Sequence, residues 1–341
     1  MSMQAATRPS LRRHERRLVH LEPKTGRYTH GSFADLPARL QAGDLLVLND
    51  AATLPASLRV TRSNHAMLEL RLLRRRGPGR WTAALFGVGS WQTPTEERSP
   101  PPRLSIGETL TAADDLHLEV DGISAETPRL VEVRFVEHGP AQLNALYRVG
   151  EPVRYSYLDH AEPLASFQTV YASRPWASEM PSAGRALSWE LLLELREGGI
   201  RLATLTHAAG LSSIDGAQLD SILPLRERFD IPKRTVDLVL ETRARRGRIV
   251  AVGTTVVRAL EGCFRERGQL EAGEGDTNLL LGPGFRPEIV DGILSNMHEP
   301  GDSHFELLSV FVSRAQLLSA VESAIARGYR AHEFGDGLLV L

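Results

Sequence analysis

The chain has 341 residues, of which 42% are hydrophobic, and a formal net charge of −2 at pH 7. This length is sufficient for two globular domains with apolar cores. The small net charge gives no overall attraction to nucleic acid, so a polyanionic partner would have to be bound by local basic patches. Cys263 is the only cysteine, which excludes an intrachain disulfide and a thiolate metal site and suits a reducing cytoplasm. No apolar run predicts a membrane span or a secretory signal.

The N-terminal part of the chain predicts strands of a sheet. Residues 17–21 and 28–33 are β-like runs on either side of a turn at residues 23–26, which is typical of a hairpin. Residues 44–50 predict a buried central strand that ends in Asn49 and Asp50. Because open α/β sheets bind ligands at the carboxyl ends of their strands, these two polar side chains are candidate ligand contacts.

Between residues 57 and 138 the pattern changes to short β-like runs with glycine and proline turns between them. The runs are residues 68–73, 81–86, 116–120 and 130–135. They predict a small β-barrel or sandwich inserted into an α/β chain. We therefore expect a mixed-sheet, multi-layer α/β domain formed by residues 1–56 and 139–341, with an inserted β-barrel domain at residues 57–138.

The remainder of the chain alternates between helical and strand patterns, as is typical of a sheet covered by helices. Helical spacing of apolar residues occurs in residues 187–197, 233–245, 254–267, 305–313 and 315–327. Strands are predicted at residues 200–205, 277–281, 289–294 and 338–341.

One short stretch joins a predicted strand, a glycine turn and a helix. Residues 248–252 form an apolar run that ends at Gly253, as expected for a strand buried on both faces. Thr254 is positioned to cap the following helix, and Arg258 can either bind a carboxylate or pair with Glu261. The start of such a helix offers free N–H groups and a positive dipole end to an anionic or nucleotide ligand, although the same junction also serves as ordinary scaffold.

Seven segments along the chain carry distinctive motifs. They are GDLLVLND at 43–50, QTVYA at 168–172, PSAG at 181–184, AVGTTVVRALE at 251–261, GPGF at 282–285, NMH at 296–298 followed by Pro300, and YR at 329–330 followed by GD at 335–336. In this order they resemble the S-adenosylmethionine:tRNA ribosyltransferase-isomerase family of queuosine biosynthesis. The resemblance spans nearly the whole chain, and the predicted inserted barrel agrees with the architecture of that family.

The resemblance implies that S-adenosylmethionine is a co-substrate and that its ribosyl portion, rather than its methyl group, is transferred. The acceptor would be the aminomethyl group of a 7-deazaguanine in tRNA, and the products would be epoxyqueuosine, adenine and methionine. Such a reaction needs a base near the 5′ carbon of the donor and a proton donor for the departing adenine. It requires no metal.

Several segments depart from the family pattern. Ala51 and Ala52 stand where the family has Thr-Lys, and residues 185–187 lack its histidine. Residues 207–213 alter a glycine-rich run, and residues 296–303 lack a lysine. Because two of these changes remove cations that would favour an anionic ligand, two alternatives stay open. One is a divergent paralogue that uses S-adenosylmethionine with a small-molecule acceptor, and the other is a non-catalytic nucleotide- or RNA-binding relative.

The resemblance and the predicted strand ends together indicate three sets of site residues. Candidates for proton transfer are His298, His207 and Asp336. Candidates for binding S-adenosylmethionine are Asn49, Asp50, Gly253, Thr254, Thr255, Arg258, Pro283, Gly284 and Phe285. Candidates for binding the acceptor are Gln168, Tyr171 and Asn296. Each also has a structural interpretation, such as a turn, a helix cap or an ordinary hydrogen bond.

The predicted partners are tRNA and the small-molecule donor, with no membrane contact and a monomer favoured. Arginine clusters at residues 12–17, 74–76 and 245–248 are candidate contacts to tRNA phosphates. Runs of this kind also occur as solvated surface without a partner.

Overall fold

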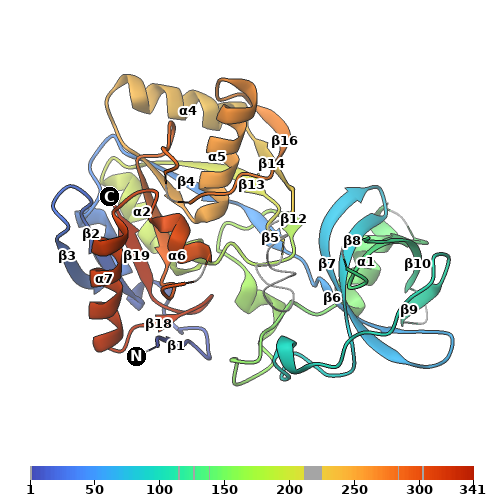
Figure 1. The fold of residues 1–341 in the computed structure, drawn as a ribbon. Coiled ribbons are helices and arrows are strands. Elements are labelled where there is room, and N and C mark those ends of the chain that lie inside the picture. Colours follow the sequence, from blue (N-terminus) through green and yellow to red (C-terminus); the bar gives the residue numbers. More distant parts are fainter. Residues whose placement is uncertain are drawn as a thin grey trace.

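The structure is a computed structural model that describes residues 2–113, 116–125, 127–137, 139–210, 225–282, 284–301 and 303–341. Its larger part is a nine-stranded mixed sheet with strand order β16-β14-β13-β4-β15-β17-β19-β2-β3 (Figure 1). The strands are β2 (Arg17–Leu21), β3 (Tyr28–Ser32), β4 (Leu45–Asn49), β13 (Arg201–His207), β14 (Glu227–Ile231), β15 (Ile249–Val252), β16 (Gly273–Thr277), β17 (Gly292–Asn296) and β19 (Gly337–Val340).

The strands β13, β4, β15 and β17 are parallel neighbours, so their carboxyl ends lie at one edge of the sheet. The expected hairpin at the N-terminus is confirmed, because β2 and β3 pair antiparallel. At the other side of the sheet, β14 runs antiparallel to β13, so β14 begins at the edge where β13 ends.

Helices cover both faces of this sheet. One face carries α4 (Lys233–Ala244), α5 (Thr254–Arg267), α6 (Ser303–Leu308) and α7 (Arg314–Ala326). The other carries α2 (Trp189–Glu197) and the 3-10 helices η2 (Phe33–Ala38) and η5 (Ser182–Ala186). In β4, Leu45 and Val47 pack into the first core and Leu46 and Leu48 into the second, as the alternation of a strand requires. The predicted mixed-sheet, multi-layer α/β fold is confirmed.

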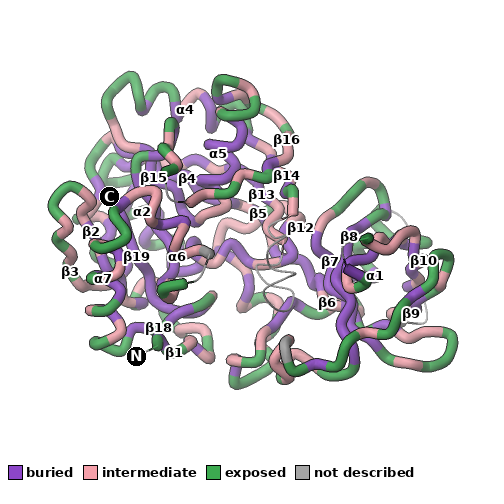
Figure 2. Tube along the Cα trace, viewed as in Figure 1, coloured by how far each residue is buried: buried purple, intermediate pink, exposed green. Residues whose placement is uncertain are grey.

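A closed barrel lies beside the sheet, with strand order β10-β11-β8-β7-β6-β9 (Figure 1). Its strands are β6 (Ser57–Thr61), β7 (Met67–Gly77), β8 (Arg80–Phe86), β9 (Thr109–Ala113), β10 (Leu116–Ile123) and β11 (Leu130–Phe135). Figure 2 shows buried residues in the barrel as well as in the sheet, and they form a separate apolar core. The predicted β-barrel is confirmed, although β6 and β9 were not among the predicted runs.

Short elements connect the barrel to the sheet. β5 (Ala51–Thr53) follows β4 and pairs in parallel with β12 (Arg174–Ala177). The helix α1 (Gly139–Val149) follows the last barrel strand and packs Ala145 and Leu146 into the barrel core. The sequence did not predict α1.

Two predicted strands are displaced in the structure. The strand predicted at residues 277–281 lies earlier in the chain, since β16 ends at Thr277 and residues 278–281 are irregular. Residues 289 and 290 precede β17 instead of belonging to it. The reason is Glu261 of α5, whose carboxylate accepts the backbone N–H groups of Ile289 and Val290, each at 2.9 Å.

Two features are absent from the described ranges. No helix in them is both long and apolar enough to cross a membrane. No group of three or more His, Cys, Asp or Glu side chains in them is placed to hold a metal ion.

Candidate active site

A hydrogen-bonded cluster forms where β4 and β13 end. The side chain of Asn49 accepts the backbone N–H of His207 at 2.9 Å and donates to its carbonyl oxygen at 3.0 Å. Asn49 also donates to Oγ1 of Thr255 at 3.1 Å, which ties the first turn of α5 to the same point. Asn49 and His207 are fully buried. The structure therefore brings together three of the predicted site residues, from three separate segments.

The imidazole of His207 faces a carboxylate that the sequence patterns did not single out. Its Nε2 lies 3.5 Å from Oε2 of Glu227, the first residue of β14, and neither ring nitrogen has a hydrogen-bond partner in the described chain. Burial and the nearby guanidinium of Arg258 hold the pKa of His207 well below its ordinary value. The ring is therefore neutral at pH 7.

Glu227 is held by two donors. Arg258 donates to Oε2, and the backbone N–H of Gly210 donates to Oε1 at 2.8 Å. Burial raises the pKa of Glu227 although Arg258 opposes the shift. A carboxyl group and an imidazole whose pKa values are shifted in opposite directions therefore lie side by side, which is a common arrangement in sites of proton transfer.

Two expectations about α5 were wrong. Thr254 does not cap the helix, because the N-cap is Gly253, with φ of 90° and no side-chain capping bond. Arg258 does not pair with Glu261, because its partner is Glu227 on the neighbouring strand. The i+3 spacing allows the pair with Glu261, but that carboxylate is occupied by the backbone N–H groups before β17.

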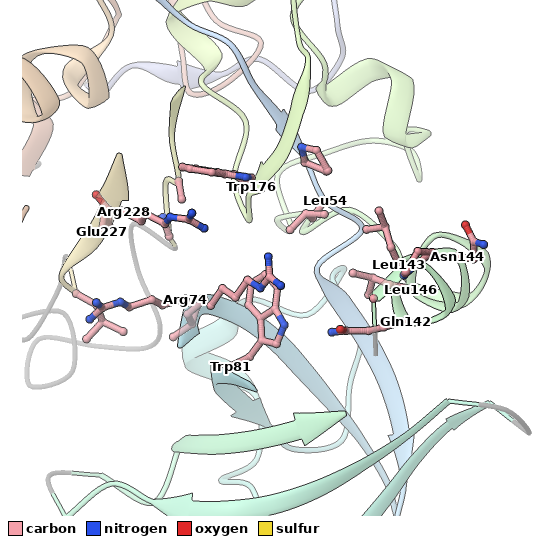
Figure 3. Close-up of a pocket in the computed structure, with 18 residues that line it drawn as sticks. Leu54, Arg74, Trp81, Gln142, Leu143, Asn144, Leu146, Trp176, Glu227 and Arg228 are labelled. Atoms are coloured by element: carbon pink, nitrogen blue, oxygen red, sulfur yellow. The ribbon is translucent and has the colours of Figure 1, made fainter. Parts of the chain in front are cut away.

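A cavity of about 380 Å³ opens beside this cluster, between the sheet edge and the barrel (Figure 3). Glu227 and Arg228 line it from β14, Trp176 from β12, and Trp81 from β8 of the barrel. The remaining wall comes from the end of β7, the helix α1 and the connecting segments, including Leu54, Arg74, Gln142, Leu143, Asn144 and Leu146. Glu227 thus joins the cavity to the cluster of His207 and Arg258.

The cavity offers flat apolar surfaces together with hydrogen-bond donors. Figure 3 shows Trp176 and Trp81 on different sides of it. The guanidinium groups of Arg228 and Arg174 both stack on Trp176, 3.9 and 4.1 Å from the ring centroid. The indole Nε1 of Trp81 and the Nε of Arg74 are buried without a hydrogen-bond partner in the described structure. Aromatic and guanidinium planes together with polar hydrogens suit a purine-like base with acceptor nitrogens.

His298 lies at the same sheet edge, two residues after β17. Its Nε2 is 3.3 Å from Oγ of Ser295, and its ring stacks on His304 at 4.8 Å between centroids. Burial and the neighbouring histidines His304 and His332 hold the pKa of His298 well below its ordinary value. Like His207, it is a neutral imidazole at pH 7.

Asn296 ends β17 and is held between two segments. Its Nδ2 donates to Oγ of Ser182 at 2.8 Å, and its Oδ1 accepts from Arg16 at 3.3 Å. Gly253, directly after β15, lies close to Ala183 of η5, because a Cβ atom at this glycine would be 3.4 Å from the Cβ atom of Ala183. The helix η5 therefore lies across the ends of both β15 and β17. The structure therefore places Asn296 and Gly253 beside the same short helix.

Two other predicted residues have structural partners. The carboxylate of Asp336 accepts the backbone N–H groups of Arg17 and Arg330 at 3.0 and 2.9 Å and pairs with the Arg17 guanidinium at 2.7 Å. Gln168 exchanges two hydrogen bonds with the backbone of Thr53, each of 2.9 Å. These contacts occupy both side chains, so we assign neither of them a chemical role.

Asp50 and Tyr171 lie close to the cluster. Asp50 accepts hydrogen bonds from Thr206 at 2.6 Å and from Ser173 at 2.9 Å. Burial and the nearby charge of Asp50 raise the pKa of Tyr171. The Tyr171 hydroxyl fills the space beside Gly184, where a side chain would overlap it.

The last predicted segment is separated from the rest. Phe285 stacks on Arg265 in the final turn of α5, with the guanidinium carbon 4.2 Å from the ring centroid. Arg265 stands eleven positions after Thr254 in this helix, or about 16 Å along the axis. Gly284 adjoins Phe285 with φ of 90° in an exposed turn, and Pro283 lies outside the described residues. The structure does not bring Phe285 to the start of α5.

The sequence contained signals for the residues that were missed. In β14 the pattern Glu227, Phe229, Ile231 places a glutamate on the buried face of a strand. A carboxylate in such a position requires a partner, which here is Arg258. Trp176 carries no comparable signal, because it stands in a proline-containing segment without clear periodicity.

The fold and the site together define an α/β protein with an inserted barrel and a cavity at the carboxyl edge of its sheet. A family model described as "Queuosine biosynthesis protein" matches residues 2–340. The chain therefore belongs to the queuosine biosynthesis protein family.

Individual relatives agree with this assignment. The chain is 35% identical to a protein of Gloeobacter violaceus over 98% of this chain and 92% of that protein, and 35% identical to one of Thermus thermophilus over 92% and 89%. Both are named S-adenosylmethionine:tRNA ribosyltransferase-isomerase. A crystal structure of S-adenosylmethionine tRNA ribosyltransferase from Thermotoga maritima has a TM-score of 0.55 and 26% identity, covering 99% of this chain and 96% of that one.

Proposed function

We propose that this protein transfers and isomerises the ribosyl portion of S-adenosylmethionine onto the aminomethyl-7-deazaguanine of tRNA, releasing adenine and methionine and giving epoxyqueuosine. The full-length similarity to relatives named for this reaction supports the proposal. This similarity disfavours a small-molecule acceptor and a non-catalytic role, which the departures from the family pattern had left open.

The observation that carries the proposal is the position of Glu227. It is a buried carboxyl group that lines the cavity and also contacts Arg258 and His207. We place the adenine of the donor in this cavity, which Arg228, Trp176 and Trp81 line. Burial raises the pKa of Glu227, which makes it easier for this carboxyl group to take up a proton and pass it to the departing adenine.

The removal of a proton from the donor's 5′ carbon requires a base. We assign this role to His298, whose depressed pKa keeps it neutral and which lies at the same sheet edge as the start of α5. His207 does not line the cavity, and it acts behind Glu227 as a positioning residue. Asn49 fixes the backbone of His207, and Thr255 joins that clamp to α5.

The test is an incubation of the protein with S-adenosylmethionine in the presence and absence of tRNA that carries the aminomethyl-7-deazaguanine. Adenine and methionine are quantified by mass spectrometry, and the modified nucleoside is identified after digestion of the tRNA. We expect product only when the tRNA is present. Release without tRNA would indicate a small-molecule acceptor or simple cleavage, and binding without release would indicate a non-catalytic protein.

A further inference from the structure

Three arginines from two distant segments gather beside η5. Arg13 and Arg16 come from the N-terminal segment, and Arg185 comes from η5 itself. Arg13 donates to the backbone carbonyl oxygens of Gln168 and Arg185, at 2.9 and 3.3 Å. Arg16 and Arg185 are each only 4% exposed. The tertiary structure thus buries part of an arginine run that the sequence alone suggested as a surface for tRNA.

The buried guanidinium groups are incompletely bonded. Arg16 donates to Asn296, but its Nε and one terminal nitrogen have no hydrogen-bond partner in the described structure. Arg185 donates from Nε to the carbonyl oxygen of Ser166 at 2.8 Å and stacks on Phe334, while one terminal nitrogen is unpartnered. Among the described residues, no carboxylate lies within ion-pair distance of the three arginines, and Asp336, which is near Arg16, pairs with Arg17.

The energetics of this cluster favour an anion. Burial and the repulsion of Arg13 lower the pKa of Arg16 to about 10, although Asp336 opposes the shift. Burial and the repulsion of Arg13 and Arg16 lower the pKa of Arg185 to about 9, although the charge of Glu162 opposes the shift. Buried charges are normally paired, and buried donors without a protein partner are normally met by a ligand, an ion or an ordered water. A bound oxyanion would accept the free N–H groups and relieve the repulsion.

The cluster borders the candidate active site. Arg16 contacts Asn296 at the end of β17, and η5, which carries Arg185, lies against Gly253 at the start of α5. Arg13 and Tyr171 are only partly buried, so solvent reaches one side of the cluster. A small ligand that lies along the sheet edge can therefore approach the cluster from the side of Arg13.

We propose that Arg13, Arg16 and Arg185 form an anion subsite that binds the carboxylate of the amino-acid part of the donor. The assignment rests on the proposed function, which makes S-adenosylmethionine the donor. A terminal carboxylate has two oxygens that match the paired N–H groups of a guanidinium. The phosphates of a polynucleotide remain at the protein surface, whereas Arg16 and Arg185 are almost completely buried.

The test compares S-adenosylmethionine with its decarboxylated analogue, which keeps the adenine, ribose, sulfonium and amine. Isothermal titration calorimetry on the full-length wild-type protein should show that loss of the carboxylate weakens binding about 10- to 100-fold. Equal affinity for the two compounds would overturn the subsite and leave the donor assignment intact. Binding of neither compound would contradict the proposed function itself, and the subsite with it.

Single variants test whether these arginines cause the preference for S-adenosylmethionine over its decarboxylated analogue. Arg16→Gln and Arg185→Gln should each weaken S-adenosylmethionine about 10-fold or more and leave the affinity for the decarboxylated analogue nearly unchanged. Arg27→Gln is the matched control, because Arg27 is exposed in the β2–β3 hairpin and should not alter either affinity. Variants that fold, as judged by circular dichroism, but keep the full preference for the carboxylate would overturn the proposal.

A second measurement avoids the risk that these variants fail to fold. Wild-type protein is labelled with phenylglyoxal, and modification of the partly exposed Arg13 is quantified by peptide mass spectrometry. S-adenosylmethionine should protect Arg13 and the decarboxylated analogue should not. Protection by tRNA alone, without protection by S-adenosylmethionine, would show that the cluster binds a phosphate and would overturn the carboxylate assignment.

Discussion

The carboxamide of Asn49 holds both backbone polar atoms of His207, although 158 residues separate the two in the sequence. The parallel pairing of β4 and β13 makes this possible, because it places the end of each strand beside the other. Asn49 also donates to Thr255, so one buried side chain connects β4, β13 and α5. The clamp determines where the imidazole of His207 stands relative to Glu227.

Asn49→Asp should therefore destabilise the protein. The substitution keeps the shape of the side chain but replaces a donor with an acceptor, which would face the carbonyl oxygen of His207. We expect a loss of about 2–4 kcal/mol in the free energy of unfolding, measured by urea denaturation. Asn64→Asp is the control, because exposed Asn64 only accepts a hydrogen bond, from the N–H of Ala66. Equal stability of both variants would show that the clamp contributes little.

Glu227→Gln should remove the proton donor while preserving the volume of the side chain. We expect the single-turnover rate of adenine release to fall at least 100-fold, because an amide cannot protonate the leaving base. The affinity for S-adenosylmethionine should change much less. Glu241→Gln, at an exposed position of α4, should behave like wild type. A Glu227→Gln enzyme with full activity would eliminate this carboxyl group as the acid.

His298→Gln tests the proposed base. Turnover should fall about 100-fold or more, and His65→Gln in an exposed barrel turn should leave it unchanged. The pKa of His298 in the folded protein lies below the ordinary value of 6.5. Below pH 6.5 the unfolded chain therefore binds a proton at this residue more readily than the folded protein does, so the stability that is complete above pH 6.5 is lost as the pH falls. Wild-type stability should thus decrease below pH 6.5 more steeply than that of His298→Gln. Parallel stability curves would contradict the depressed pKa.

Trp176→Ala tests the placement of adenine in the cavity. Stacking of a base on an aromatic ring contributes about 1–3 kcal/mol, so the affinity for S-adenosylmethionine should fall about 10- to 100-fold by calorimetry. Trp189→Ala is the control, since Trp189 is 55% exposed on α2. If only the affinity for tRNA falls, the cavity holds the acceptor base instead of the donor.

The buried carboxyl group of Glu333 should make the stability of the protein depend on pH. It accepts the hydroxyl of Tyr157, and burial raises its pKa from the ordinary 4.5 to about 7. A raised carboxyl pKa contributes stability below about pH 4.5 that is lost as the pH rises through 7. The free energy of unfolding of Glu333→Gln, measured with denaturant, should therefore rise relative to that of wild type as the pH increases from about 5 to about 8. We expect this relative increase to be about 1–3 kcal/mol. Exposed Glu266→Gln should show no such gain.

The sequence by itself determined the local elements and the family. Period-two and helical patterns depend on which face of a segment is buried, so β4, β15 and α5 could be predicted from their own residues. Polar residues at strand ends, such as Asn49, also indicated the ligand edge of the sheet.

The tertiary structure alone decided which of these residues meet. Arg258 pairs with Glu227 and not with Glu261, and Arg16 is buried beside Asn296 instead of facing solvent. Phe285 lies near the far end of α5. The physical reason is that local periodicity fixes the orientation of a side chain on its own element, whereas its partner depends on strand order and layer packing between distant segments. Both the cavity and the arginine cluster arise from that long-range packing.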